Sequence, residues 1–390
     1  MTKETYRPTR RQFLAGGCAA VAAPYVIPAV ALGADGRPPA SERIVMGGIG
    51  LRNQGGGDRI NFLRNEEVQY AAACDVLKSV RDRFQSKNCK VYVDYRELLA
   101  RPDIDAVHIG TPEHWHAQMI VDACRAGKDV FCQKPESLTL GEGPKMVAAA
   151  RRYGRVVSGG SQRVLEDYRP TVDKCWAGEL GTIKSINING GNLSQPCNLP
   201  AEPVPEGLDW DLWLGPAPWA PFNRERLGFN RWRDYSGGGL TDWGSHHFGA
   251  AMFAVGVRDL QPEEVIYHAE QGGHLTFRFA GGVLLTHKCP GKKHFEVEGT
   301  PGEKKAPQPV PVYAGRSKLI HGDFLDCVKT RRKPFRDIQY AANTMAVCHL
   351  AVIAYDLKRS LKWDAARQEF VGDEEANRFV DRARREPWWL

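Results

Sequence analysis

The fold class is best read from residues 44–75, IVMGGIGLRNQGGGDRINFLRNEEVQYAAACD. A short apolar run ends in glycines at Gly50, residues 56–64 are expected to begin a helix, and a second apolar run ends on Asp75. A strand that turns through glycines into a helix and then into a second strand is typical of a βαβ unit. The stretch therefore predicts the first unit of a parallel sheet with helices on its faces.

The alternation of strands and helices continues as far as residue 162. Further strands are expected in AVHIGTP, DVFCQKP and RVVSGGS, and helices in HWHAQMIVDACRAG and over residues 139–153. Parallel strands joined by helices form a doubly wound α/β sheet. We therefore predict a Rossmann domain over residues 42–162.

The pattern changes after this domain. Residues 195–235 are rich in Pro, Trp, Asn and Arg, and a long irregular segment of this kind is usually functional. Alternating strands and then two helices are expected near residues 263–269, 272–280, 282–288, 293–298, 317–330 and 338–358. We predict an α+β domain for substrate binding and oligomerisation over residues 163–365, with a large, mostly antiparallel open sheet, and a C-terminal tail over 366–390.

The first 34 residues are set apart from the fold. Paired arginines in TRRQFLAGG, a modest apolar run and small residues before Ala31 resemble a twin-arginine export signal. Two prolines interrupt the run, whereas a membrane span needs about 20 apolar residues, so an N-terminal anchor is the weaker alternative. We expect cleavage after Ala31 or Ala34, no stable membrane anchor, and a periplasmic or other extracytoplasmic location.

The composition excludes several classes of function. Hydrophobic residues make up 42% and charged residues 25%, which is ordinary for a soluble globular protein. The net charge of +7 is carried partly by the export segment, and the chain lacks a Lys/Arg block interleaved with aromatic residues, so we expect no nucleic-acid partner. The ten cysteines form no CxxC pair, which argues against a zinc knuckle and a dense disulfide framework.

The glycine turn after the first strand suits a dinucleotide. Gly48 and Gly50 let the backbone approach a pyrophosphate, and the following helix offers free N–H groups. Asp75 can accept both ribose hydroxyls of NAD and would repel a 2′-phosphate, although Lys78 nearby keeps NADP as an alternative. The residues expected at the cofactor are Gly48, Gly50, Asn53, Gln54, Asp75, Thr111, Pro112, His114, His116, Gln133 and Lys134.

Two further segments carry groups for proton transfer. Lys134 follows the strand DVFC, and a lysine at the carboxyl end of a parallel strand points into the ligand crevice, where its ammonium favours a substrate alkoxide. Asp242 and His246 are four residues apart in GGGLTDWGSHH, so on a helix they share one face and Asp242 can orient the imidazole. Histidine suits proton removal near neutral pH.

A metal site is the weaker alternative for the histidines. His246 and His247 could ligate a metal with His114 and His116, but adjacent residues point apart on a helix. We therefore expect no metal. The residues expected to contact the substrate are Gln162, Arg163, Arg231, Trp232, Arg233, Tyr235 and His247.

These motifs resemble the glucose–fructose oxidoreductase/inositol dehydrogenase (Gfo/Idh/MocA) family over about residues 42–390. Gln133-Lys134-Pro135 is similar to the family's Glu-Lys-Pro signature, and Asp242 with His246 matches its catalytic Asp-x-x-x-His pair. The RRQFL signal, TPEHWHAQM and the C-terminal segment are similar to exported members common in planctomycetes. The resemblance implies an NAD-binding fold, an open C-terminal sheet that forms homo-oligomer interfaces, and sugar-like substrates.

Two positions depart from the family pattern. Gln133 stands in place of a glutamate, and Gly249 stands where many members have an aspartate. Lys134, Asp242 and His246 remain, so hydride transfer stays feasible. In this hypothesis His246 accepts the proton of a secondary hydroxyl of a sugar, polyol or glycoside, Lys134 stabilises the alkoxide, and Asp242 orients His246.

Two other functions stay open. Some relatives are glycoside hydrolases or lyases that use tightly bound NAD transiently, through oxidation, elimination and reduction. Export favours this alternative, because a periplasm offers no obvious pool of free NAD and a cofactor that stays bound removes that need. The other alternative is a non-catalytic sugar-binding protein with the same fold.

Overall fold

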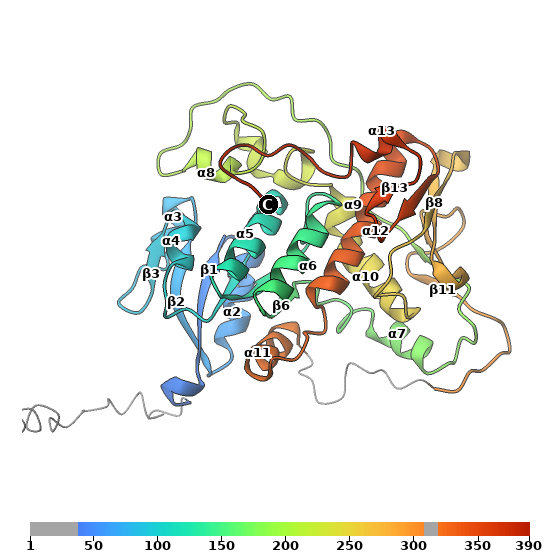
Figure 1. The fold of residues 1–390 in the computed structure, drawn as a ribbon, viewed down its shortest axis with the longest axis horizontal. Coiled ribbons are helices and arrows are strands. Elements are labelled where there is room, and N and C mark those ends of the chain that lie inside the picture. The colour runs from blue at the N-terminus through green and yellow to red at the C-terminus, as the bar shows by residue number, and fades with distance from the viewer. Residues whose placement is uncertain (1–37, 308–318) are drawn as a thin grey trace, which may run out of the picture. The chain divides into compact units, whose positions relative to one another are not determined.

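Two β-sheets organise residues 38–307 and 319–390, which the computed structural model describes. The first sheet is wholly parallel, in the order β3-β2-β1-β4-β5-β6 (Figure 1). Its strands are β1 (Ile44–Ile49), β2 (Val68–Cys74), β3 (Lys90–Tyr92), β4 (Ala106–Ile109), β5 (Asp129–Cys132) and β6 (Val157–Gly159). This order is that of a doubly wound Rossmann sheet, so the predicted fold class is confirmed.

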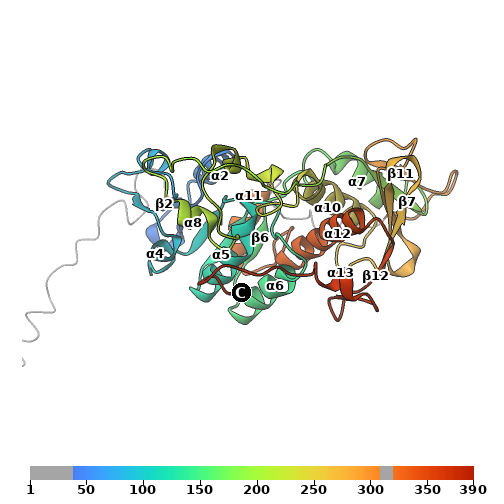
Figure 2. The same cartoon turned by 90° about the horizontal axis from the view of Figure 1, so that it is seen from above.

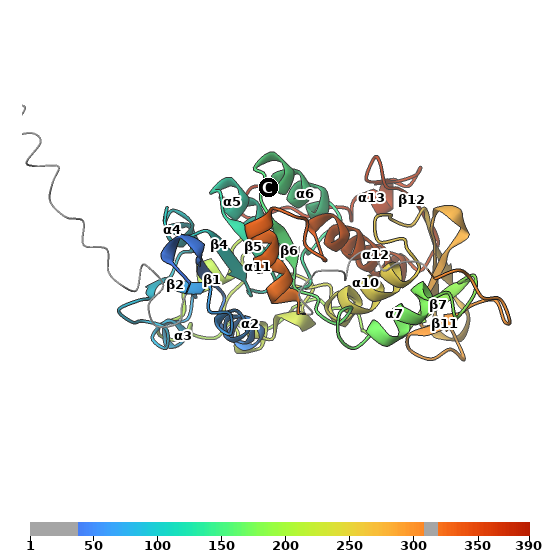
Figure 3. The same cartoon turned by 90° about the horizontal axis from the view of Figure 1, so that it is seen from below.

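Helices cover both faces of this sheet. They are α2 (Asn53–Leu63), α3 (Lys78–Arg81), α4 (Tyr95–Leu99), α5 (Glu113–Arg125), α6 (Glu142–Arg152) and the distant α11 (Ile320–Thr330). Figures 2 and 3 show α2 and α11 on one face and α4, α5 and α6 on the other. Phe131 of β5 meets Phe62 of α2 and Phe324 of α11 edge to face, at ring separations of 5.2 and 5.8 Å. The strands are apolar on both sides because both sides are covered.

The second sheet has the order β11-β7-β10-β9-β8-β12-β13 and is antiparallel except where β10 pairs with β7. Its strands are β7 (Ser185–Ile188), β8 (Glu264–His268), β9 (His274–Arg278), β10 (Leu284–His287), β11 (Glu296–Glu298), β12 (Leu361–Asp364) and β13 (Glu369–Phe370). The remaining α-helices are α7 (Arg169–Trp176), α8 (Trp210–Leu214), α9 (Gly239–Asp242), α10 (Gly244–Ala254), α12 (Ile338–Leu357) and α13 (Glu374–Asn377). The predicted mostly antiparallel second sheet is therefore confirmed.

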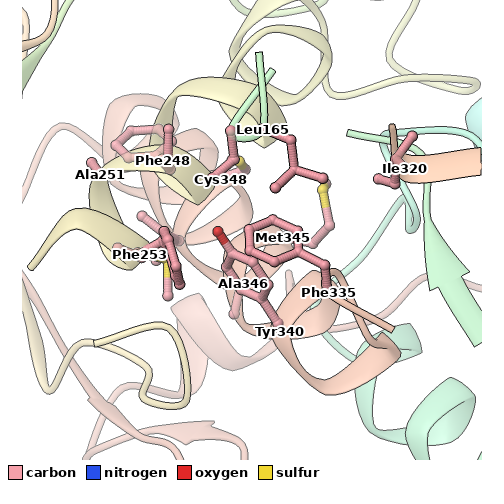
Figure 4. Packing of buried hydrophobic residues seen from close by; sticks show 14 of the residues in the cluster. Leu165, Phe248, Ala251, Phe253, Ile320, Phe335, Tyr340, Met345, Ala346 and Cys348 are labelled. Carbon is pink, nitrogen blue, oxygen red and sulfur yellow. The ribbon is translucent and has the colours of Figure 1, made fainter. Parts of the chain in front are cut away.

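Helices α10 and α12 form the core between the two sheets. The side chain of Asp337 caps α12 by accepting the backbone N–H of Tyr340 at 2.9 Å. Helix α12 packs on α10, on α6 of the first sheet and on β8 of the second. Figure 4 shows the shared apolar packing, with Phe248 and Ala251 from α10 and Cys348 from α12. Because α10 is buried along its whole length, the residues around its first turn are held rigidly.

The segment 195–235 is ordered and packs on the Rossmann domain. It contains α8 and two 3₁₀ turns, Arg224–Leu227 and Phe229–Arg231. The C-terminal tail returns to the same region, where the backbone N–H of Arg385 donates to the carbonyl of Pro216 at 3.1 Å. The aromatic ring of Trp388 then lies 4.7 Å from that of Trp115 on α5. Residues far apart in the chain therefore build one wall beside α5.

Residues 38–43 hold a single 3₁₀ turn, Ala40–Glu42. The predicted export signal over residues 1–34 lies outside the described residues. Within residues 38–307 and 319–390, no helix is long and apolar enough to cross a membrane.

Candidate active site

A cavity of ≈ 360 Å³ lies at the carboxyl ends of β1, β2, β4 and β5. The predicted cofactor residues that line it are Gly50, Asn53, Gln54, Asp75, Thr111, Pro112, His116, Gln133 and Lys134. Asp242 lines the same cavity from α9. Ligands of doubly wound sheets bind at this edge, where the strand order reverses between β1 and β4.

Glycines allow the backbone to close tightly around one end of the cavity. Gly50 has a φ of +75°, and a Cβ there would lie 2.7 Å from the backbone nitrogen of Thr111. A Cβ on Gly55 would lie 2.0 Å from the carbonyl oxygen of Gly50. Gly55 comes late for a regular G-x-G-x-x-G motif, but here it permits the close packing of helix on strand that the third glycine provides. The N-terminus of α2 therefore reaches the cavity.

Gly48 and His114 do not line this cavity, in contrast to the prediction. Gly48 lies inside β1, where a Cβ would overlap the hydroxyl of Tyr70 at 1.6 Å, so this glycine makes room within the fold. His114 is buried, and its Nε2 bonds to the carbonyl of Trp213 at 3.0 Å. His116 does line the cavity, and its ring nitrogens lie 2.6 Å from the carbonyl oxygen of Pro135 and 2.7 Å from that of Thr111, of which a neutral imidazole donates to one.

Asp75 sits where an acid would meet the ribose of a dinucleotide. Its carboxylate accepts the backbone N–H groups of Leu51 at 2.9 Å and Leu77 at 3.0 Å. Burial raises the pKa of this carboxyl, while the two N–H groups and the nearby guanidiniums of Arg52 and Arg81 work in the opposite direction. The group is thus fixed in orientation and still faces the cavity.

Lys134 and Asp242 meet at the other end of the cavity. The ammonium of Lys134 forms an ion pair with the carboxylate of Asp242, and both side chains are partly exposed. Lys134 extends from the end of β5, and Asp242 ends α9, so the contact joins the Rossmann domain to the segment before α10. The sequence predicted both residues at one site, and the structure brings them together.

His246 is buried beside this pair, although it does not line the cavity itself. Its Nδ1 is 2.7 Å from the hydroxyl of Ser161, which follows β6. Burial and the neighbouring charges of Lys134 and Arg336 lower the pKa of the imidazole to about 2, so it is neutral. We expected Asp242 to orient His246. The carboxylate of Asp242 is paired with Lys134, and the side chain that is hydrogen-bonded to His246 is that of Ser161.

The two departures from the family pattern have structural partners. The amide of Gln133 donates to the fully buried carboxylate of Asp58 at 2.8 Å, and Asp58 also bonds to Nε2 of His321 at 2.9 Å. A glutamate at position 133 would place two carboxylates in contact. The amide therefore compensates a buried aspartate on α2.

Gly249 makes room for a buried guanidinium. A Cβ on Gly249 would lie 2.7 Å from Nη1 of Arg336, which is fully buried and pairs with Glu136 at 2.9 Å. Any side chain at position 249 would collide with this ion pair. Gly249 therefore leaves the space that the buried Glu136–Arg336 ion pair occupies.

The predicted substrate residues fall into two groups. Arg163 and His247 lie close to His246: the charge of Arg163 lowers the pKa of His246 further, and both side chains contact Trp243. Gln162 adjoins Ser161 in the chain and is half-buried. The other four belong to the 195–235 segment: Tyr235 accepts from Arg226, Arg233 pairs with Asp356, Trp232 donates to the carbonyl of Glu225, and Arg231 is exposed. None of the seven predicted substrate residues lines the cavity.

Sequence reasoning missed several residues that line the cavity. From the 195–235 segment they are Leu212, Trp213, Leu227, Phe229 and Asn230. The aromatic composition of the segment indicated a packed structure but gave no position for each side chain. Glu113 also lines the cavity from the first turn of α5, and nothing in its sequence context distinguished it from an ordinary surface acid. No group of three or more His, Cys, Asp or Glu side chains in the described ranges has metal-binding geometry.

Fold and site together define a dinucleotide-binding protein with a second, sheet-based domain. Residues 43–161 match the model for an oxidoreductase family with an NAD-binding Rossmann fold. Residues 192–277 and 312–390 match the model for the C-terminal alpha/beta domain of the same oxidoreductase family. The chain belongs to the Gfo/Idh/MocA oxidoreductase family, and the predicted family is confirmed.

Curated relatives share only part of their length with this chain. An uncharacterised oxidoreductase, YrbE of Bacillus subtilis, is 32% identical over 44% of this chain and 51% of its own length. An alpha-N-acetylgalactosaminidase of Shewanella oneidensis is 37% identical over 29% of this chain and 27% of its own. The alignments therefore span about half of the first relative and about a quarter of the second.

The similarity of the fold extends further. The WlbA dehydrogenase of Bordetella pertussis, solved with NADH and UDP-GlcNAcA, superposes with a TM-score of 0.58. The match covers 83% of this chain and 99% of WlbA at 17% identity, so it establishes the shared fold.

Proposed function

We propose that this protein is an NAD-dependent oxidoreductase that acts on a secondary hydroxyl of a sugar, polyol or glycoside. One observation carries the proposal: the Lys134–Asp242 pair lines the same cavity as Gly50 and Asp75. A cation that can hold a hydroxyl oxygen therefore shares one crevice with a dinucleotide cradle. The sugar ligand of WlbA supports the substrate class.

The residues present fit NAD. The absence of side chains at Gly50 and Gly55 leaves the α2 N-terminus accessible to a pyrophosphate, and Asp75 suits a ribose. Lys78, which left NADP open, pairs with Asp82 at 2.7 Å. We therefore propose NAD as the preferred cofactor over NADP.

Three side chains carry the proposed chemistry. NAD, when bound, supplies a nicotinamide that takes up or returns a hydride. Lys134 holds the substrate oxygen and stabilises its alkoxide form, and Asp242 holds Lys134. We assign proton acceptance to His246: when its Nδ1–H donates to Ser161, the neutral ring keeps an Nε2 lone pair for the hydroxyl proton. Because its pKa is about 2 and it does not line the cavity, the role requires a rearrangement that brings the substrate hydroxyl to Nε2, with Lys134 carrying the charge of the alkoxide.

We also propose that NAD stays bound between turnovers. The 195–235 segment is tied to both rims of the cavity. On the Asp75 side, the backbone N–H of Lys78 donates to the carbonyl of Gly207 at 2.8 Å, and on the α5 side, Nε1 of Trp115 donates to the carbonyl of Trp213 at 3.1 Å. Release of a cofactor beneath this segment would require these bonds to break.

A retained cofactor supports a second candidate, a glycoside hydrolase or lyase that oxidises, eliminates and reduces within one cycle. The alpha-N-acetylgalactosaminidase among the relatives favours it. The two candidates differ in net products: a dehydrogenase accumulates NADH, whereas the hydrolase releases a free aglycone or sugar without NADH.

The test uses purified full-length protein. The dinucleotide released by denaturation is identified by mass spectrometry, and the native protein is then given NAD and a panel of sugars and chromogenic glycosides. Accumulating NADH supports the dehydrogenase, and aglycone release without NADH supports the hydrolase. Protein that carries or binds NAD yet converts no member of the panel would contradict both.

Location and assembly are part of the proposal. We infer export by the twin-arginine route, with residues 1–34 as the signal, and a homo-oligomer that forms through the open second sheet. Fusion of residues 1–34 to a reporter tests the first, because export should stop when Arg10 and Arg11 are replaced by lysine. Light scattering of the purified chain tests the second, and a monomer would contradict it.

A further inference from the structure

Glu113 is a buried acid at the junction of the two domains. It follows Pro112 at the end of β4 and begins α5. Its side chain is 1% exposed, and it lines the cofactor cavity together with Lys134 and Asp242. The proposed roles of Asp75, Lys134, Asp242 and His246 do not involve this carboxyl.

Every hydrogen bond described for the carboxyl of Glu113 comes from one short segment of the other domain. The hydroxyl of Ser236 donates to Oε1 at 2.5 Å, and the backbone N–H of Gly237 and the hydroxyl of Thr241 reach Oε2 at 3.2 Å each. The next residue after Thr241 is Asp242, the partner of Lys134. The acid thus anchors the segment that delivers Asp242 to the cavity.

This segment needs an anchor because of its composition. Residues 237–239 are three consecutive glycines, and Gly238 has a φ of +84°. Glycine loses more backbone entropy on ordering than any other residue, so a free glycine turn samples many conformations. A Cβ on Gly237 would lie 2.2 Å from the side chain of Thr241, so the glycine also permits the tight turn toward Glu113.

We propose that Glu113 is a positioning residue, which fixes the 236–241 turn so that Asp242 meets Lys134 at the cofactor cavity. The inference rests on the proposed function for its kinetic consequences, but its geometric content is independent of the substrate. In this role Glu113 couples the end of β4, which borders the cavity, to the segment that carries Asp242.

The anchor tolerates protonation of the acid. Burial raises the pKa of Glu113 to about 8; Asp242 also raises it, and Lys134 lowers it, while Cys348 faces the group from α12. As an anion, Glu113 accepts from the Thr241 hydroxyl. As a neutral acid, it donates to Thr241 Oγ1, whose own hydroxyl then donates to the carbonyl of Gly238 at 3.0 Å. The turn stays anchored on both sides of the pKa.

Two substitutions distinguish anchoring from mere filling of space. Glu113→Gln keeps two of the three bonds, since its oxygen accepts from Ser236 and its amide donates to Thr241, but the amide nitrogen cannot accept the N–H of Gly237. Glu113→Ala removes all three bonds. We expect Glu113→Ala to lower kcat/KM about a hundredfold, as misplacement near reacting groups does, and Glu113→Gln to stay within about tenfold of wild type.

The matched control is Glu142→Gln on α6. Glu142 is equally buried and accepts the backbone N–H of Leu138 at 2.6 Å, but it lies outside the cofactor cavity. This variant should lose stability without loss of kcat/KM. Equal effects of Glu113→Ala and Glu142→Gln on kcat/KM would overturn the proposal.

A structural readout keeps the test independent of the substrate. Crystal structures of wild type and Glu113→Ala with NAD should show the 237–239 turn displaced and the Lys134–Asp242 contact broken in the variant. If the wild type turns over no substrate, the proposed function fails while this comparison still decides the role of Glu113. A variant structure with that contact intact contradicts the inference.

Discussion

Single residues explain why this chain departs from its family pattern and keeps its site. Gln133 carries an amide because Asp58, fully buried on α2, needs a donor there as well as the bond to His321. Gly249 lacks a side chain because Arg336 occupies the space that a Cβ would need. The first change avoids a second buried carboxylate beside Asp58, where an unpaired ion would be costly, and the second leaves room for the Arg336–Glu136 ion pair.

Restoring the family's glutamate should therefore harm the protein. In Gln133→Glu, two buried carboxylates would share one site, so the pKa of the pair rises and stability is retained at low pH but lost as pH rises through that pKa. We expect the free energy of unfolding in urea to fall by about 1–3 kcal/mol at pH 8 and by less at pH 5.

The double variant Gln133→Glu/Asp58→Asn is the control, because it exchanges the donor and acceptor and should recover most of the loss. Equal stability of Gln133→Glu and wild type at pH 8 would show that the amide does not compensate Asp58.

Ser161 is the second residue-scale prediction. Its hydroxyl holds Nδ1 of His246, so Ser161→Ala should let the imidazole rotate and lower kcat by about tenfold with little change in KM. Steady-state kinetics with a substrate identified from the panel of sugars and glycosides provide the measurement. Ser158→Ala is the matched control, since Ser158 is equally buried on β6 and its hydroxyl, among the described residues, donates to the carbonyl of Gly159 at 3.3 Å. Indistinguishable kinetics for the two variants would remove Ser161 from the site.

At the scale of elements, a short helix and the C-terminal tail enclose the cofactor cavity. Leu212 and Trp213 of α8 line the cavity. The guanidinium of Arg385 on the tail bonds to the carbonyls of Asp211 at 2.8 Å and Gly215 at 3.0 Å, at the two ends of this helix. The tail therefore holds α8 in place from the outer side.

Loosening α8 should speed release of the cofactor. In Arg385→Ala these bonds are lost. The loss of roughly one net hydrogen bond, about 1.4 kcal/mol, corresponds to a tenfold change, so we expect the dissociation rate of NADH to rise about tenfold. Stopped-flow fluorescence with excess unlabelled NAD as the trap measures the rate.

Arg359→Ala is the comparison for this experiment, because it also removes a guanidinium that forms hydrogen bonds, in this case to the carboxylate of Asp373 near β13. It should leave the rate unchanged. An unaltered rate in Arg385→Ala would mean that α8 does not limit release.

At the scale of the whole molecule, burial of neutral histidines sets the response to acid. Burial lowers the pKa of several of them, to about 4 for His108, His114 and His287, about 3 for His247 and His349, and about 2 for His246. The unfolded chain, with histidine pKa values of about 6.5, therefore binds protons before the folded chain does. Stability is present above about pH 6.5 and falls as pH falls below it.

The melting temperature of the protein should therefore fall as the pH is lowered. We expect the melting temperature to drop by about 5 °C or more between pH 7.5 and pH 5.5, although the raised pKa values of Glu113 and Glu142 work in the opposite direction. Circular dichroism gives the measurement. His349→Gln, which keeps a donor toward Ser137, should show a shallower slope with pH. A melting temperature that is flat over this range would contradict the account.

The fold class, the family and ten of the residues that line the cavity could be predicted from the sequence. The reason is local: apolar runs at strand length, glycines after the first strand and an acid after the second are short-range signals, and parallel strands bring their carboxyl ends to one edge. Gly50, Asp75 and Lys134 could be placed together on that basis alone. Domain boundaries and export remain predictions.

The partners of the buried polar groups could not be predicted from the sequence and became known from the three-dimensional structure. Ser161 replaced Asp242 beside His246, Glu113 emerged as the anchor of a glycine turn, and the aromatic segment 195–235 proved to line the cofactor cavity. These contacts join residues about a hundred positions apart in the chain, and a buried donor or acceptor takes whichever partner the packing brings within reach. Spacing along the chain carries no information about that choice.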